Sequence, residues 1–226
     1  MACTLNPYRM PAEWESQACV WISRPDRHDT WPGCLEQAQK EFDYFANRMK
    51  LYVEVKETHE LNISTDDAWI RDYGSLYVLN NVQYSNSPLV TCQDFRFNSW
   101  GGKYPPWENN DAATQKIAKL DGINIHHHNE VVEGGAIDVN GSGTALVSTS
   151  SLLPPNRTHH LNKTQLEKTL LNSLGIRHFI WLYGHLHGDD TDGHIDTFAR
   201  FINLTTVVTP RTSKNHHDHR ELERNW

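Results

Sequence analysis

The stretch Ala136-Ile137-Asp138-Val139-Asn140-Gly141-Ser142-Gly143-Thr144-Ala145-Leu146-Val147-Ser148 has the pattern of a β-hairpin. Two short apolar runs flank Asn-Gly-Ser-Gly, and Asn and Gly are the residues that tight turns between antiparallel strands require. Downstream, a Thr-x-x-Glu box at 164–167 and a glycine at 175 predict the two ends of a helix. An apolar strand is expected at 176–183. The order strand, strand, helix, strand makes a ββαβ module.

Elements of the same kind are expected on the N-terminal side of this module. The apolar pattern predicts strands at 19–22, 51–55, 75–79 and 123–125, and helices at 35–49 and 111–120, the second with Asp111 as its N-cap. Asn80-Asn81 is expected to form a turn, and residues 95–111, rich in Gly, Pro and aromatic side chains, an ordered loop. Further strands are expected at 198–202 and 205–209. We therefore expect an α/β fold in which ββαβ-like modules recur.

The strand at 176–183 leads into Gly-His-Leu-His-Gly-Asp-Asp-Thr-Asp-Gly-His-Ile-Asp-Thr-Phe at 184–198. A strand that ends in a loop of His and Asp is typical of an active-site rim. His194 and Asp196 are two residues apart, so in an extended segment they share a face. A His beside a carboxylate is a candidate for proton transfer. A solvated polar loop without chemistry is the alternative.

A metal site is a second interpretation of the same loop. His185-x-His187-x-Asp189 after an apolar strand is similar to the first signature of metallo-β-lactamase-type hydrolases, although that signature continues with His where this chain has Asp190. The run His126-His127-His128 could supply one more ligand, but three consecutive side chains cannot share one face of a strand. A metal-dependent hydrolase that uses His185, His187 and Asp189 therefore stays open at this point.

Two carboxylates elsewhere have the setting of a cation site. Asp72 closes the run Trp69-Ile70-Arg71-Asp72, and Glu133 precedes Gly134-Gly135. Each could be a plain surface charge at a bend. Together they could instead bind one guanidinium, because its fork of N–H donors matches carboxylate oxygens.

Composition limits the remaining classes of function. The 226 residues are 38% hydrophobic and 22% charged, which suits one globular domain over 1–226 with a polar, His-rich tail at about 211–226. The net charge of −7 and the lack of a basic stripe argue against a nucleic-acid partner. No run is long enough to span a membrane, and no signal peptide is evident. The four cysteines are therefore expected to be free thiols, and the location cytoplasmic.

Five motifs in order give the chain a resemblance to a known family. They are Pro-Ala-Glu-Trp-Glu at 11–15, Asp-Asp-Ala-Trp-Ile-Arg-Asp at 66–72, Phe-Asn-Ser-Trp-Gly-Gly at 97–102, Glu-Gly-Gly at 133–135 and Asp-Asp-Thr-Asp-Gly-His-Ile-Asp at 189–196. This pattern resembles agmatine deiminase, within the peptidylarginine-deiminase-like group. The resemblance implies the pentein fold, a five-bladed α/β propeller of ββαβ units around a polar centre, of which this chain would form about three blades.

The resemblance also implies a reaction and a set of roles. The family hydrolyses agmatine to N-carbamoylputrescine and ammonia, a step toward putrescine, through a Cys-bound amidino intermediate and without a metal or cofactor. By position, Asp72 and Glu133 would bind the guanidinium, His194 would be the general acid/base, and Asp196 the second carboxylate beside the guanidinium. The residues that would line the pocket are Asp67, Trp69 and Trp100.

The chain departs from the family pattern at the nucleophile. In the family this Cys follows a His within a Gly-rich segment near the C-terminus, and none of Cys3, Cys19, Cys34 and Cys92 has that context. The stretch between residues 49 and 65 is also shorter than expected. We therefore expect that this chain carries the guanidinium-binding carboxylates and the general acid/base but not the nucleophile. Its turnover is expected to be negligible. A non-catalytic guanidine-binding remnant and a peptidylarginine deiminase are the alternatives, and a homo-oligomer is compatible with the sequence.

Overall fold

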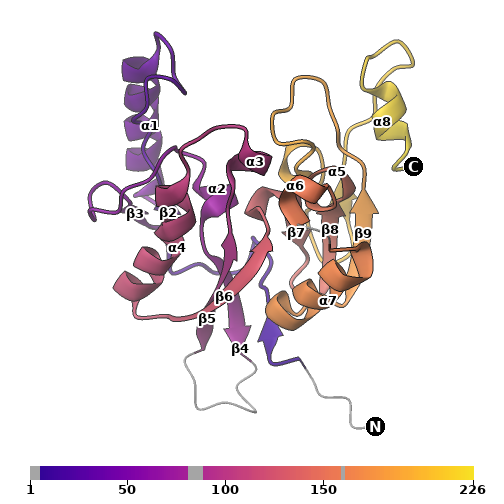
Figure 1. Cartoon of the computed structure of the whole chain (residues 1–226), viewed down its shortest axis with the longest axis horizontal. Coiled ribbons are helices and arrows are strands. Elements are labelled where there is room, and N and C mark those ends of the chain that lie inside the picture. Colours follow the sequence, from indigo (N-terminus) through magenta and orange to yellow (C-terminus); the bar gives the residue numbers. More distant parts are fainter. Residues whose placement is uncertain (1–5, 81–88, 159–160) are drawn as a thin grey trace.

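The computed structural model describes residues 6–80, 89–158 and 161–226 (Figure 1). Its strands are β1 (Tyr8–Arg9), β2 (Cys19–Ile22), β3 (Glu54–Glu57), β4 (Leu76–Asn80), β5 (Val90–Arg96), β6 (Asn124–Val131), β7 (Ile137–Val139), β8 (Thr144–Ser148), β9 (His178–Leu182), β10 (Arg200–Phe201) and β11 (Val207–Val208). Its helices are α1 (Leu35–Met49), α2 (Ile70–Tyr73), α3 (Ser99–Gly102), α4 (Glu108–Asp121), α5 (Thr149–Leu152), α6 (Pro155–Thr158), α7 (Lys163–Leu174) and α8 (His219–Glu223), with short 3₁₀ turns η2 (Gly134–Ala136) and η3 (Ile195–Thr197).

Two ββαβ modules of the same topology make up the centre of the molecule. In the first, β4 pairs antiparallel with β5, and the chain returns through α4 to lay β6 parallel to β5. In the second, β7 pairs antiparallel with β8, and α7 leads to β9, parallel to β8. A β2-α1-β3 unit with parallel strands and a β10–β11 hairpin accompany them. The expected recurrence of the module is thus confirmed.

The main hydrophobic core joins the two modules. Leu166 and Leu170 of α7 are fully buried and pack with side chains of both sheets, among them Val78, Phe95 and Val147. The short strand β1 extends the first sheet at β4, and just after it the N–H of residue 10 donates to the carbonyl of residue 174 at the end of α7. The modules therefore share one core, so the loops at their ends are held at fixed positions.

The turn chemistry of the second module is confirmed in part. The hairpin closes with the N–H of Asn140 donating to the carbonyl of Thr144 at 3.1 Å, and Gly175 ends α7 in the left-handed conformation that glycine favours. The predicted start of the helix is wrong. Asn162, two residues before Thr164, is the N-cap, and it exchanges hydrogen bonds with Gln165. Asn is as good an N-cap residue as Thr, so the capping box forms between Asn162 and Gln165 and not between Thr164 and Glu167.

Several boundaries in the first module also differ from the expectation. The helix predicted at 111–120 begins at Glu108, because the Asp111 carboxylate accepts from Arg96 and from the N–H of Phe97 rather than capping the helix. Strand β3 starts at Glu54, and residues 51–53 form a turn after α1. Strand β5 was not predicted, and β6 extends well beyond 123–125, through all three histidines at 126–128. Of the predicted turn at 80–81, residue 81 lies outside the described residues.

The C-terminal tail, polar and His-rich in sequence, contributes one residue to the core. Leu222 of α8 is 4% exposed and packs in a third hydrophobic cluster with Ile195, Phe198 and Phe201. The tail therefore lies against the segment that follows the His/Asp loop. Within the described parts of the chain, no helix is long and apolar enough to cross a membrane.

Candidate active site

The charged residues singled out in the sequence occupy equivalent places in successive modules. Asp72 lies on α2, just before β4, and Glu133 immediately precedes η2 and β7. His194 and Asp196 lie at the start of η3, just before β10. The segment that enters the first strand of each unit thus supplies the site, and α2 contacts η2, which contacts η3. Residues far apart in the sequence are brought together because the fold repeats.

His194 is held between two carboxylates. Its Nε2 lies 2.7 Å from Oε2 of Glu133, and its Nδ1 lies 3.3 Å from Oδ1 of Asp72. The imidazole and the Glu133 side chain are each only 1% exposed. Burial disfavours the charged imidazolium, but the hydrogen bonds to Asp72 and Glu133 outweigh it and raise the pKa of His194 to about 10. The ring is therefore protonated at neutral pH.

Asp72 is fixed by two further contacts, one from each module. Its Oδ2 accepts from Nε1 of Trp100 at 3.1 Å, and its Oδ1 accepts from the N–H of Gly135 at 3.0 Å. Trp100 is buried and has a left-handed backbone with φ of 54°, as does Ser99 with φ of 53°. Non-glycine residues in this region carry a strain cost of about 1–3 kcal/mol, which marks α3 as a constrained loop. The loop places the indole N–H on the carboxylate.

Gly135 allows the charged groups to come together. A Cβ at this position would lie 2.5 Å from both Oδ1 of Asp72 and Nδ1 of His194, and 2.8 Å from Oδ2 of Asp196. Such distances are far shorter than van der Waals contact, so any side chain here would push the cluster apart. Only glycine is compatible with this arrangement.

Asp196 is the least engaged carboxylate of the cluster. Among the described residues, its side chain has no hydrogen bond or ion pair, although one of its oxygens lies within 4.8 Å of ligand atoms of Asp72 and His194. Burial, followed by the charge of Asp72, raises the pKa of Asp196. A partly buried carboxylate with unused lone pairs is ready to accept from a donor that the described residues do not supply.

Arg157 is a site residue that the sequence analysis missed. Its side chain is 1% exposed, its Nε donates to Oε1 of Glu133 at 2.9 Å, and an Nη donates to Oδ2 of Asp192 at 2.8 Å. Lys103 donates to the other oxygen of Asp192 at 2.7 Å. Arg157 lies on α6, between β8 and α7, a place equivalent to that of Trp100 between β5 and α4. That equivalence is the signal that could have found it, once the module was aligned on itself.

The cluster has more acidic than basic groups. The cations are Lys103, Arg157 and the imidazolium of His194, and the carboxylates are Asp72, Glu133, Asp192 and Asp196. One carboxylate charge is therefore left over in a largely buried setting. Burial of an unpaired charge is costly, so the arrangement favours the entry of one more cation.

Asp67 and Trp69 lie on the approach to α2 rather than in the cluster. Asp67 accepts from the N–H of Trp69 at 2.9 Å and from Nδ2 of Asn110 at 3.0 Å. Burial raises the pKa of Asp67 to about 6. Trp69 is 45% exposed, and its ring lies 5.7 Å from that of Trp31. Their role in lining a pocket stays a prediction.

The metal-hydrolase interpretation is not supported. His185 and His187 are exposed, and Asp189 closes its own loop by accepting from Thr191 and from the N–H of Gly193. In the part of the chain that the structure describes, the groups of three side chains that could share an ion do not include these three. Both oxygens of Asp189 are used within its own loop, so Asp189 does not form a metal site with the two histidines.

The described cysteines do not form part of the cluster. Cys92 is fully buried on β5, and burial raises the pKa of its thiol to about 12; the charges that act on it are those of Asp94 and Asp121. Burial also raises the pKa of Cys19. Cys34 is exposed just before α1. Neither Cys19 nor Cys92 is therefore set up to act as a thiolate. Cys3 lies outside the described residues.

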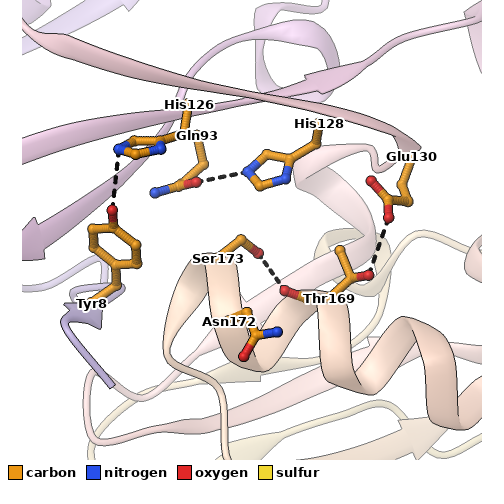
Figure 2. Close-up of a pocket in the computed structure, with 8 residues that line it drawn as sticks. All are labelled: Tyr8, Gln93, His126, His128, Glu130, Thr169, Asn172 and Ser173. Carbon is orange, nitrogen blue, oxygen red and sulfur yellow. Dashed lines mark hydrogen bonds between the residues drawn. The ribbon is translucent and has the colours of Figure 1, made fainter. Parts of the chain in front are cut away.

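A separate cavity of about 280 Å³ lies between β6 and α7 (Figure 2). It is lined by Tyr8, Gln93, His126, His128, Glu130, Thr169, Asn172 and Ser173. Strand β6 directs His126 and His128 to this side, while His127 bonds to Asp94. None of the residues with expected catalytic roles lines it.

Comparison with known proteins agrees with the fold. Agmatine deiminase of Pseudomonas aeruginosa is 32% identical over 224 residues, which cover 89% of this chain and 60% of that protein. Agmatine deiminase of Medicago truncatula is 33% identical over 230 residues, 91% of this chain and 62% of that protein. The solved structure of Enterococcus faecalis agmatine deiminase superimposes with a TM-score of 0.85 at 27% identity, covering 97% of this chain and 66% of that one. The chain thus spans about 60% of the length of these curated relatives.

The repeated ββαβ modules around a shared polar cluster are those of the pentein fold, which the superposition confirms. A profile of the Porphyromonas-type peptidyl-arginine deiminase family matches residues 9–226. The chain belongs to this family.

Proposed function

We propose that the cluster around His194 is the guanidinium-binding and acid/base part of an agmatine deiminase site, acting in the cytoplasm. The reaction proposed for the complete site is hydrolysis of agmatine to N-carbamoylputrescine and ammonia. The single observation that supports it best is the group of buried Asp72, buried His194 and partly buried Asp196 beside Glu133, with one carboxylate charge unbalanced. The relatives that carry the name agmatine deiminase support the choice of substrate.

A guanidinium fits the unused acceptors of the cluster. Oδ2 of Asp196 and Oδ1 of Asp72 both lie close to Gly135, so the two carboxylates are neighbours. A planar fork of N–H donors can bond both carboxylates at once, which a compact ammonium cannot do as well. Glu133 already binds a guanidinium through Arg157, so that partnership is chemically suited to this environment.

His194 is placed to act first as an acid. Its raised pKa means that it holds a proton at neutral pH, and Nε2 and Nδ1 both point at carboxylates. When a guanidinium carbon is attacked, the departing nitrogen needs a proton to leave as ammonia, and an imidazolium within hydrogen-bond reach can donate it. A cationic substrate on Asp72 would also weaken the hold of that carboxylate on the proton. In this proposal Asp72 and Glu133 tune His194 as well as binding substrate.

The proposal for this chain is binding without turnover. A deiminase site of this type needs a nucleophile, and burial raises the thiol pKa of the partly buried Cys19 and of the buried Cys92, which lie among other charged groups. Without a nucleophile, water would have to attack a resonance-stabilised guanidinium, and loss of a nucleophile costs several orders of magnitude in rate. The free state of the described cysteines fits a reducing compartment.

Titration calorimetry with agmatine tests the proposal. We expect saturable binding to the purified chain, a loss of about tenfold or more in affinity for Asp196→Asn and Asp72→Asn, and no ammonia release. The loss follows from removing one charge-assisted hydrogen bond, worth about 1.5–3 kcal/mol. Absence of saturable binding to the wild type, or wild-type affinity in both variants, would refute the guanidinium site.

A matched control is available on β5. Asp94 is a buried carboxylate bonded to His127 at 2.6 Å, like the pair in the cluster but with different neighbours. Asp94→Asn should leave agmatine affinity unchanged. A peptide with an internal arginine tests the competing substrate of the family. If it binds as tightly as agmatine, peptidylarginine rather than agmatine becomes the substrate.

A further inference from the structure

A second group of metal-ligating side chains lies where the His/Asp loop meets the C-terminal tail. His216, His217 and Asp218 precede α8 and each place one ligand atom within 4.8 Å of the others. The ring of His187, from the loop after β9, lies with its centroid 4.8 Å from that of His217. This group shares no residue with the cluster around His194, and the proposed function does not use it.

The distances in this group match those of a tetrahedral metal site. Zn²⁺ binds His nitrogens and carboxylate oxygens at about 2.0–2.2 Å, so two ligands of a tetrahedral ion lie roughly 3.3–3.5 Å apart. Oδ2 of Asp218 lies 3.1 Å from Nε2 of His217 and 3.7 Å from Nδ1 of His216. Both separations are close to the required value, so an ion could be bound with small side-chain adjustments.

The carboxylate is already oriented by the neighbouring loop. Oδ1 of Asp218 accepts from the N–H of His187 at 2.8 Å, which leaves Oδ2 directed at the two imidazoles. The Asp218 side chain is 14% exposed, whereas those of His216 and His217 are 43% and 58% exposed. A fixed carboxylate beside two accessible imidazoles is a reachable site with a preorganised anchor.

The three side chains come from one short turn. The N–H of Asp218 donates to Nδ1 of His216 at 3.2 Å, and the rings of His216 and His217 lie 4.1 Å apart between centroids. An ion bound by Nδ1 of His216 would displace this backbone hydrogen bond, whereas an ion bound by Nε2 would leave it in place.

We propose that His216, His217 and Asp218 bind one first-row transition-metal ion of the Zn²⁺ class, with water completing the coordination. The mixture of imidazole and carboxylate ligands suits Zn²⁺, Cu²⁺ and Ni²⁺ and does not suit Mg²⁺. Because Asp218 also accepts from the N–H of His187, the ion holds the tail against the loop at 184–193 that leads into His194. It acts as a structural clamp and takes no part in the reaction.

Metal titration of protein purified without a polyhistidine tag tests this site. We expect Zn²⁺ to bind with one-to-one stoichiometry, Co²⁺ to give the visible absorption of a tetrahedral ion, and Mg²⁺ not to bind. Removal of an outer-sphere partner alone costs 10- to 100-fold in metal affinity, so removal of a ligand in His217→Ala should cost at least about tenfold. Asp218→Asn, which keeps the volume of the side chain, should weaken binding similarly.

Two variants show whether another group takes the metal instead. Glu57, His59 and Glu60 also lie close together, but Glu57 is already ion-paired, with Nζ of Lys50 2.7 Å from its Oε1. His59→Ala and Asp196→Asn should leave Zn²⁺ affinity unchanged, with circular dichroism confirming that every variant is folded. Absence of Zn²⁺ binding, unchanged affinity in folded His217→Ala and Asp218→Asn, or a loss confined to His59→Ala or Asp196→Asn would overturn the proposal.

Discussion

The backbone N–H of Gly135 donates to Oδ1 of Asp72 across 3.0 Å, and this bond ties the entrance of β7 to the entrance of β4. The same carboxylate oxygen lies 3.3 Å from Nδ1 of His194, at the entrance of β10. Three units of the fold therefore meet at one oxygen atom. The chemistry of the cluster depends on how closely the backbone of η2 approaches it.

Gly135→Ala should abolish agmatine binding with a modest loss of stability. The added methyl would lie 2.5 Å from both Asp72 and His194, so the carboxylate and imidazole must separate. We expect at least about a tenfold loss of affinity and a fall in the free energy of unfolding of about 1–3 kcal/mol. Calorimetry and urea unfolding measure the two effects.

Gly122→Ala is the matched control for this substitution. Gly122 ends α4 with φ of 63°, and no atom lies within 4 Å of its virtual Cβ. Alanine there should cost about 1–2 kcal/mol through backbone strain alone and leave agmatine affinity unchanged. A similar loss of affinity in both variants would show that general destabilisation, not the crowding of the cluster, is responsible.

The stability of the protein should fall at alkaline pH because of His194. Its pKa is raised from the ordinary 6.5 to about 10 in the folded state. A raised pKa contributes stability that is fully present below about pH 6.5 and is lost as the pH rises through about 10. Compared with His194→Gln, the wild type should therefore lose on the order of a few kcal/mol more between about pH 7 and 10, measured by urea unfolding. Parallel pH profiles for the two proteins would contradict the imidazolium assignment.

Much of the fold was predictable because the strongest local signals agree with the tertiary structure. The Asn-Gly turn at 140–143 fixes the hairpin, and Gly175 ends α7, each for a conformational reason that needs no distant partner. The start of α7 was missed because two acceptable caps, Asn162 and Thr164, are two residues apart. Asp111 was misassigned because Arg96 and Phe97, distant in sequence, compete for its carboxylate.

The candidate site also contains residues that the sequence predicted and residues that it did not. Asp72, Glu133, His194 and Asp196 were identified from motifs and do lie together in the structure. Arg157 was missed because no local spacing marks it and its partners are 24 and 35 residues away, so only the alignment of one module on the other would have pointed to it. The core contact of the tail could not be predicted from the sequence, because Leu222 is a single apolar residue among charges.

Asn162→Ala should destabilise the protein, whereas Thr164→Ala should not. The Asn162 side chain accepts from the N–H of Gln165 at 3.0 Å, and the Gln165 side chain accepts from the N–H of Asn162 at 2.9 Å. Loss of an N-cap side chain costs about 1 kcal/mol. Thr164 is exposed within α7, so its substitution should change the free energy of unfolding by less than about 0.5 kcal/mol. If chemical unfolding shows Thr164→Ala to be the more destabilising of the two, Thr164 is the N-cap, as the sequence predicted.

Arg157→Met should be among the most destabilising substitutions of a charged residue in this chain. The guanidinium is 1% exposed and bridges Glu133 to Asp192, so its removal leaves a buried carboxylate without its partner. Breaking a buried ion pair in this way costs about 3–5 kcal/mol. Chemical unfolding of Arg96→Met supplies the comparison, because the Arg96 side chain is 61% exposed and its ion pair with Asp111 should contribute about 1 kcal/mol or less. If Arg157→Met fails to fold, Arg157→Lys, which keeps the charge but not the fork, should fold with an intermediate stability. Equal unfolding midpoints for the Arg157 and Arg96 variants would show that Glu133 does not depend on Arg157.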